Sequence, residues 1–317
     1  MQSKLIIKTK HYSQFDTKFI QLKLKTIYIH AIIVKNNNFA SNKNIIKMDL
    51  TYFFEELWKQ YTVKTPSAQK IKSLFEAEGN TVFNDHIAIR TFNDPRVNID
   101  ILAKPFIAMG YEPKGEYHFK AKKLRAKHFE HKSDGNAPKI FISELLLEEF
   151  SVELNSIIQN TINQIAHTVL QQEDLILKGR VWAKPFFEIY KRLLSVSEYA
   201  AWVYVNGFCS NHFTVDVNKL QTFKNLSKVN EFLKENGFKM NTSGGEIKGS
   251  PSQLLEQSSI LADVVEVEFE ENVKEITSCY YEFSYRYKNN HAVIFNGFIA
   301  DSADKIFEST DMQLQSS

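Results

Sequence analysis

Residues 83–92 read Phe-Asn-Asp-His-Ile-Ala-Ile-Arg-Thr-Phe, and residues 210–215 read Ser-Asn-His-Phe-Thr-Val. Both stretches alternate apolar or β-branched side chains with polar ones, which is the pattern of a strand in a sheet. Successive side chains of a strand point to opposite faces, so His86 and Arg90 are expected on one face of the first strand. His212 is expected on the corresponding face of the second strand.

The two strands open two similar segments. Each strand is followed by a helical pattern, at about residues 99–109 and 227–235, and each pattern ends at a glycine followed by an aromatic residue. The two histidines stand 24 and 25 residues before these glycines. This spacing predicts an internal repeat of a strand, a helix and further strands.

The rest of the chain extends this pattern to an α+β fold. Apolar spacing predicts helices near residues 50–58 and 68–78, and residues at about 145–207 read as a helical insertion between the two copies. Further strands are predicted at residues 128–131, 139–143, 264–269, 279–287 and 292–298. Two copies of such a module are expected to form a curved sheet around a metal site.

Charge separates an N-terminal segment from the rest of the chain. Residues 1–47 hold nine lysines and one acid, Asp16, and we expect a basic, disordered extension there. Residues 48–317, with 30 basic and 36 acidic side chains, are predicted to form one catalytic domain with a net charge of −6. Nucleic acid is therefore not an expected partner. The sequence gives no indication of the oligomeric state.

Cysteine content and hydropathy indicate a cytoplasmic protein. Cys209 and Cys279 are the two cysteines of the chain, too few for a disulfide framework or a thiolate zinc cluster. Apolar runs are shorter than the roughly 18 residues that a membrane-spanning helix needs. No membrane association is expected.

A metal site is the chemistry that the repeat favours. Histidines at equivalent places in two copies can converge if the copies are related by a two-fold axis, and Glu282 on a later strand can add a carboxylate. Glu144 competes with Glu282 for this role, and strand periodicity does not separate them. Two imidazoles and a carboxylate leave about three of six octahedral positions open, as in iron(II) oxygenases, and zinc also accepts these ligands.

Other residues are expected to bind the substrate. Arg90 stands two pleats from His86, where its guanidinium can hold a carboxylate of a substrate that the metal chelates. Residues 244–251 read as a flexible loop that can close over a ligand, so Ser250 joins Arg90, His86 and His212 as a predicted substrate-binding residue.

Several runs resemble a known family, DUF1338, which includes 2-oxoadipate dioxygenase/decarboxylases. The resemblance spans about residues 50–312. The runs are residues 84–90 (Asn-Asp-His-Ile-Ala-Ile-Arg), 138–145 (Pro-Lys-Ile-Phe-Ile-Ser-Glu-Leu), 210–215 (Ser-Asn-His-Phe-Thr-Val), 247–251 (Ile-Lys-Gly-Ser-Pro) and 280–283 (Tyr-Tyr-Glu-Phe). The chain is similar to the compact branch of that family.

The resemblance implies a fold of the vicinal oxygen chelate type, with Fe(2+) on His86, His212 and Glu282 and with Arg90 on the substrate carboxylate. It implies a non-heme iron(II) dioxygenase that converts a 2-oxo dicarboxylic acid and O2, for example 2-oxoadipate to 2-hydroxyglutarate and carbon dioxide in lysine catabolism. Two alternatives remain open. One is a glyoxalase-like lyase or isomerase that uses another metal, and the other is a metal-free module that binds a small acid.

Overall fold

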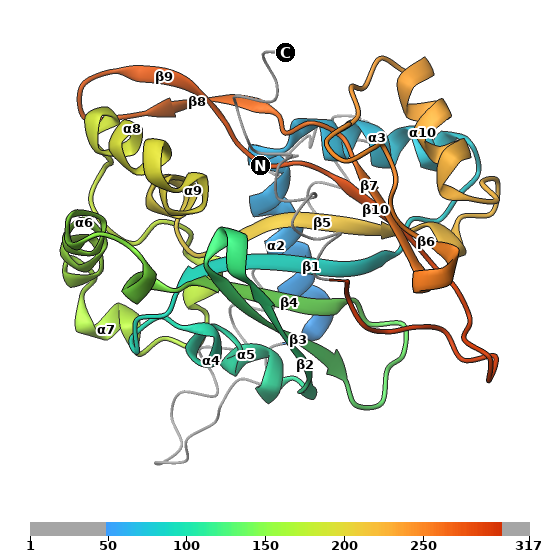
Figure 1. Ribbon diagram of the computed structural model, residues 1–317, viewed down its shortest axis with the longest axis horizontal. Helices are drawn as coiled ribbons and strands as arrows, with labels where there is room; N and C mark the ends of the chain where they lie inside the picture. The colour runs from blue at the N-terminus through green and yellow to red at the C-terminus, as the bar shows by residue number, and fades with distance from the viewer. Residues whose placement is uncertain (1–48, 300–317) are drawn as a thin grey trace, which may run out of the picture. The chain divides into compact units, whose positions relative to one another are not determined.

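The fold is built on an eight-stranded sheet, seen in the computed structural model, which describes residues 49–299 (Figure 1). Its strands are β1 (Asn84–Phe92), β2 (Tyr111–Phe119), β3 (Leu124–His131), β4 (Lys139–Leu145), β5 (Ser210–Asp216), β6 (Lys248–Ser250), β7 (Leu255–Ser259) and β10 (Glu282–Arg286). Their order across the sheet is β2-β3-β4-β1-β5-β10-β7-β6.

This order divides the sheet into two equivalent halves. The first half is β1 to β4, in which β4 pairs parallel with β1. The second half is β5, β6, β7 and β10, in which β10 pairs parallel with β5. β1 and β5 join the halves as antiparallel neighbours in the middle of the sheet. The predicted α+β fold with a duplicated module is confirmed.

One face of the central strands is covered by helix α2 (Leu50–Lys64), which crosses behind β1 and β5 in Figure 1. The side chain of Asp49 caps this helix by accepting a hydrogen bond from the backbone of Thr51. Trp58 and Tyr61 of α2 pack against Phe213 of β5, with ring centroids 5.1 and 4.9 Å apart. Phe213 therefore points to the helix, and strand alternation turns its neighbour His212 to the other face.

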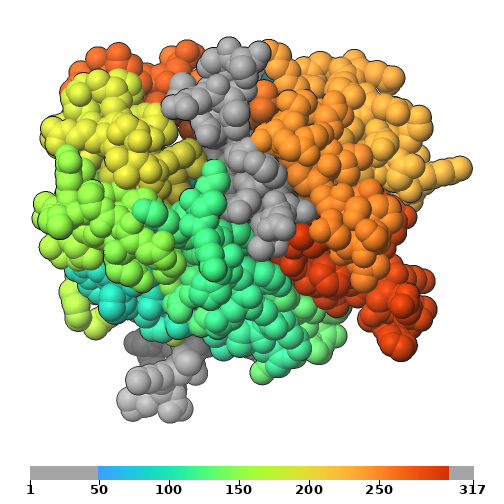
Figure 2. All heavy atoms as spheres, in the orientation of Figure 1, coloured from blue at the N-terminus to red at the C-terminus, as the bar shows by residue number. Residues whose placement is uncertain are grey.

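Further helices surround the sheet. α3 (Pro66–Ala77) follows α2, and α10 (Leu226–Glu235) follows β5. The insertion between β4 and β5 holds four helices: α6 (Val152–Asn163), α7 (His167–Leu170), α8 (Phe187–Val196) and α9 (Glu198–Asn206). Figure 2 shows this insertion, in green and yellow, at the left of the view, and the light-orange residues that follow β5 at the right.

Two parts of the first half differ from the sequence-based expectation. The predicted helix at 99–109 is two short helices, α4 (Ile99–Leu102) and α5 (Lys104–Ala108), because Pro105 has no N–H to continue the hydrogen-bond ladder. The sequence analysis also missed β2, whose side chains are mostly not buried and which contains Pro113 and Gly115.

The second half also brings corrections. The predicted strand at 292–298 is wrong, since this segment makes only an isolated bridge from Ile294 to Lys288. Its carbonyls at Phe295 and Gly297 accept hydrogen bonds from the Arg286 side chain instead of from a strand. The predicted loop 244–251 contains the short strand β6, and β7 was not expected. β8 (Val264–Glu268) and β9 (Val273–Thr277) form a separate two-stranded sheet.

The sequence also led to expectations about an N-terminal extension and about membrane association. The proposed N-terminal extension, residues 1–47, lies outside the described part of the chain. Within residues 49–299, the structure contains no helix with the length and apolar character that crossing a membrane requires.

Candidate metal centre

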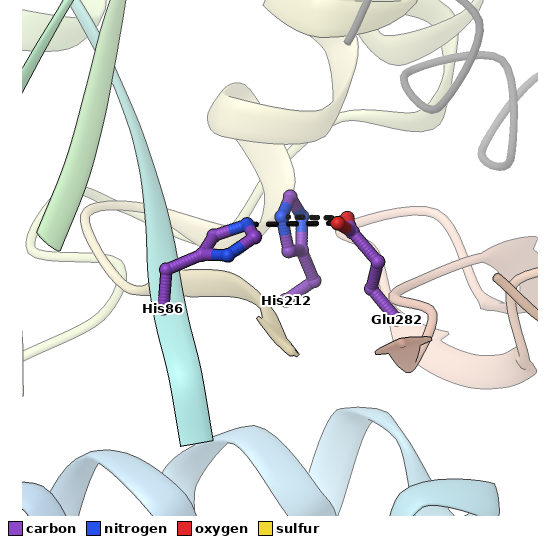
Figure 3. A group of neighbouring side chains, drawn as sticks. All are labelled: His86, His212 and Glu282. Carbon is purple, nitrogen blue, oxygen red and sulfur yellow. Dashed lines mark ion pairs between the residues drawn. The ribbon is translucent and has the colours of Figure 1, made fainter. Parts of the chain in front are cut away.

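His86, His212 and Glu282 come from three adjacent strands and converge on one point (Figure 3). The register of the sheet explains this. Thr214 of β5 pairs with His86 of β1 on one side and with Glu282 of β10 on the other. His212 stands two residues before Thr214 and therefore shares its face. The three side chains thus surround the position of Thr214.

The three side chains are buried and close enough to share an ion. Glu282 Oε1 lies 3.6 Å from His86 Nε2, and Glu282 Oε2 lies 3.2 Å from His212 Nε2. One ligand atom of each residue lies within 4.8 Å of the other two. Each residue is at most 4% exposed. Ligands at about 2 Å from a common metal stand about 3 Å apart, so small adjustments complete such a site.

A β-bulge precedes each histidine. In the pairing of β1 with β5, Asp85 is the extra residue before His86, and Asn211 is the extra residue before His212. Each bulged residue turns its side chain back to the following imidazole: Asp85 Oδ1 lies 2.7 Å from His86 Nδ1, and Asn211 Oδ1 lies 3.0 Å from His212 Nδ1. Because each oxygen accepts from Nδ1–H, both Nε2 atoms are left to face the shared point.

The protonation states of the two imidazoles suit metal ligation. Burial lowers the pKa of His86, and it lowers the pKa of His212 further, to well below the ordinary value, so both rings are neutral. Burial raises the pKa of the Glu282 carboxyl to about 8, although Gln257 donates a hydrogen bond to Oε1 at 2.6 Å. A divalent cation among these three groups offsets the cost of burying the carboxylate charge.

Behind His86 lies a buried ion pair. Arg286 donates from Nε to Asp85 Oδ2 at 2.6 Å and from Nη2 to Oδ1 at 2.9 Å. Burial works against the ionised Asp85 carboxylate, but the Arg286 charge and the hydrogen bond with His86 hold its pKa well below the usual range. A charged Asp85 therefore orients the His86 ring. This pair was not predicted from the sequence, because it links residues about 200 positions apart.

Arg90 lies on the face of the triad and is 1% exposed. Its Nη1 donates to Glu198 Oε1 at 3.0 Å, and its guanidinium lies 5.0 Å from the ring centre of Tyr199 and 5.2 Å from that of Trp202. All three partners belong to α9, so the helical insertion fixes the orientation of this cation. Nothing in the strand pattern indicates these contacts, and none of the three residues was predicted as part of the site.

Two other residues that the sequence singled out make hydrogen bonds within the fold. Glu144, the competitor of Glu282, is buried on β4, pairs with Arg125 at 2.6 Å and accepts from the backbone N–H of Ile99 at 2.9 Å. It thus binds the first backbone N–H of α4, whose N-cap is Asn98, and it is not among the three grouped side chains. Ser250 lies on the edge strand β6, where its hydroxyl contacts Ser252 at 2.9 Å and caps the following turn. Its substrate-binding role stays a prediction.

Comparison with known proteins identifies the family of the chain. The family model of 2-oxoadipate dioxygenase/decarboxylase matches residues 53–288. The chain is 37% identical to the 2-oxoadipate dioxygenase/decarboxylase, chloroplastic/amyloplastic, of Oryza sativa subsp. japonica over 276 residues, which covers 80% of this chain and 76% of the relative.

Solved structures share the fold. The hydroxyglutarate synthase of Oryza sativa in complex with 2-oxoadipate superposes with a TM-score of 0.79 at 33% identity, over 88% of this chain and 96% of that one. A protein of Shewanella frigidimarina NCIMB 400, described as a candidate hydrolase, superposes with a TM-score of 0.75 at 48% identity, over 80% of this chain and 98% of that one.

The fold type extends to a more distant protein. A glyoxalase superfamily protein of Ralstonia eutropha JMP134 gives a TM-score of 0.64 at 19% identity, over 78% of this chain and 84% of that one. This likeness concerns the fold alone, and it agrees with the vicinal oxygen chelate type expected from the sequence. Together with the family match over residues 53–288, these findings establish that the chain belongs to the 2-oxoadipate dioxygenase/decarboxylase family.

Proposed function

We propose that the protein is an iron(II)-dependent dioxygenase and decarboxylase whose metal is held by His86, His212 and Glu282. The observation that carries this proposal is the convergence of two neutral imidazoles and one buried carboxylate on a single point. This donor set suits first-row divalent metals, and it leaves coordination positions for other ligands. When bound, iron(II) supplies these open positions and redox chemistry with O2.

We further propose 2-oxoadipate as the substrate. Support comes from the relatives: one is named for this activity, and a solved relative at 33% identity holds 2-oxoadipate. Conversion of 2-oxoadipate and O2 to 2-hydroxyglutarate and carbon dioxide balances in atoms and electrons without a second reductant. By the family resemblance, the reaction belongs to lysine catabolism.

The chain's own residues have distinct roles in this proposal. Arg90 binds a carboxylate of the substrate, and its contacts with two aromatic rings of α9 keep the guanidinium in a fixed orientation. Asp85 and Asn211 orient the two imidazoles. The burial of the triad keeps bulk water from the reacting end of the substrate, which protects the reaction from unproductive turnover.

Oxygen uptake with a panel of 2-oxo acids tests the proposal. The protein is loaded with iron(II) without air, and O2 consumption and carbon dioxide release are then measured together. We expect uptake with 2-oxoadipate, coupled one to one to carbon dioxide release. No uptake with any member of the panel, or turnover that continues without O2, contradicts a dioxygenase. The second result indicates a lyase or isomerase at the same site.

We also propose that the protein works in the cytoplasm. The free, buried thiols of Cys209 and Cys279 suit a reducing compartment. The plant relatives are named as plastid proteins. Imaging of the full-length chain with a C-terminal fluorescent tag tests this proposal, and accumulation of the tag in an organelle contradicts it.

A further inference from the structure

Tyr280 has a buried hydroxyl for which the proposed function gives no role so far. The residue is 0% exposed, and within residues 49–299 its phenolic oxygen has no hydrogen-bond partner. A buried hydroxyl without a partner costs about 1–3 kcal/mol. An unsatisfied group of this kind in a site is explained if a bound molecule completes its hydrogen bond.

The side chain lies against the metal triad. Tyr280 stands two residues before Glu282, the first residue of β10. Its ring stacks on the imidazole of His212 with a centroid distance of 4.7 Å and an interplanar angle of 27°. The aromatic face thus covers one side of the His212 imidazole.

The neighbouring Tyr281 shows that burial alone does not define such a site. Tyr281 is also 0% exposed, and its hydroxyl also has no hydrogen-bond partner in the described part of the chain. Its ring, however, packs with Trp58 and Tyr61 of α2, at centroid distances of 5.8 and 6.4 Å, on the other face of the sheet. The two tyrosines share residue type and burial but differ in the face that they occupy.

We infer that Tyr280 is a substrate-contacting residue, whose hydroxyl donates a hydrogen bond to an oxygen at the 2-oxo acid end of the substrate. The inference rests on the proposed function for its substrate class. Because the ring lies against His212, the contact belongs to the end of the substrate held at the triad. The carboxylate bound by Arg90 is the other end. A hydrogen bond to a charged oxygen contributes about 1.5–3 kcal/mol, which corresponds to roughly a 10- to 100-fold change in affinity.

Binding of 2-oxoadipate to the iron(II)-loaded protein without O2 tests the inference directly. Isothermal titration calorimetry compares the wild type with Tyr280→Phe and with the matched control Tyr281→Phe. We expect binding to weaken about 10-fold or more in Tyr280→Phe and less than about 2-fold in Tyr281→Phe. Iron content is expected to stay at the wild-type level in both variants. The melting temperature is expected to stay at or above the wild-type value, because each variant loses only an unpaired buried hydroxyl.

A second ligand assigns the contact to one end of the substrate. For a 2-oxo monocarboxylic acid of the same chain length, Tyr280→Phe should weaken binding as much as it does for 2-oxoadipate. Equal binding by wild type and Tyr280→Phe, an equal loss in Tyr281→Phe, or loss of iron in Tyr280→Phe overturns the inference. So does an effect confined to the dicarboxylic acid.

The calorimetric test also separates this inference from the proposed reaction. If the wild type binds 2-oxo acids but consumes no O2, the dioxygenase proposal fails while the Tyr280 contact is still measured. If the wild type binds no 2-oxo acid, the substrate class and the Tyr280 contact are both overturned.

Discussion

The two halves of the sheet have the same topology but contribute differently to the site. Ala88 and Thr214 each stand two residues after a histidine, and their parallel neighbours are Phe141 in the first half and Glu282 in the second. Phe141 therefore occupies the position equivalent to the carboxylate ligand. Its ring packs with Tyr117 and Phe298, at centroid distances of 5.6 and 4.9 Å. Duplication supplies two histidines, and divergence at this position limits the proposed set of metal ligands to three.

The two halves also differ in the charge of polar residues at two equivalent positions. The bulged residue before the histidine is charged in the first half, as Asp85, and neutral in the second, as Asn211. Four residues after the histidine, the first half carries the buried Arg90 and the second carries the partly exposed Asp216. The first half thus supplies the charge that supports a ligand and the cation proposed to bind substrate, while the second supplies the carboxylate proposed to bind metal.

The largest effect is expected from Glu282→Gln. The amide keeps the size of the side chain but removes the anionic ligand, so iron(II) binding should weaken by about 100-fold or more. Iron content after anaerobic loading and gel filtration measures this loss. Phe141→Leu, at the equivalent position of the first half, is the control and should retain its iron. Full iron occupancy in Glu282→Gln contradicts the assignment of the carboxylate to the second half.

A smaller effect is expected at Arg90. Arg90→Lys keeps the charge but loses the planar fork, so kcat/KM for 2-oxoadipate should fall by roughly 10- to 100-fold, mainly through KM. Asp216→Asn, at the equivalent position, should change kcat/KM by less than about 2-fold. Steady-state oxygen uptake measures both. Equal losses in the two variants indicate a general effect on the sheet and remove the special role of Arg90.

The smallest effects are expected from substitutions of Asp85 and Asn211, the bulged residues that precede the two histidines. Asp85→Asn removes the charge that pairs with the buried Arg286, and it should reduce iron affinity by about 10-fold and lower the free energy of unfolding by about 3 kcal/mol. Asn211→Ala removes a neutral hydrogen-bond acceptor and should lower the free energy of unfolding by about 1 kcal/mol. Iron titration and urea unfolding of the iron-free proteins measure these changes. If Asn211→Ala loses more iron affinity or more unfolding free energy than Asp85→Asn, the charged residue of the first half does not have the larger role proposed for it.

Strand alternation was sufficient to place the central side chains. It assigned His86, Arg90 and His212 to one face of the sheet. The assignment is reliable here because β1 and β5 lie in the middle of the sheet and each pairs with a strand on both sides. It did not predict the bulges at Asp85 and Asn211, since an extra residue in a strand depends on the register with its neighbour.

The alternation of side chains along a strand cannot predict contacts between residues that are far apart in the sequence. Glu198 reaches Arg90 from a helix more than 100 residues away, and Arg286 reaches Asp85 across about 200. The residues at 292–298 have the composition of a strand, but Arg286 takes up two of their carbonyls. Propensity cannot anticipate such a competing donor.

Metal stoichiometry tests the central claim most directly. The wild type and His212→Ala are loaded with iron(II) without air, freed of unbound metal and analysed by inductively coupled plasma mass spectrometry, with circular dichroism as a check of folding. We predict about one iron per wild-type chain and less than about a tenth of that in folded His212→Ala. Wild-type protein that retains no metal, or folded His212→Ala with a full complement of iron, would contradict the triad as a metal centre.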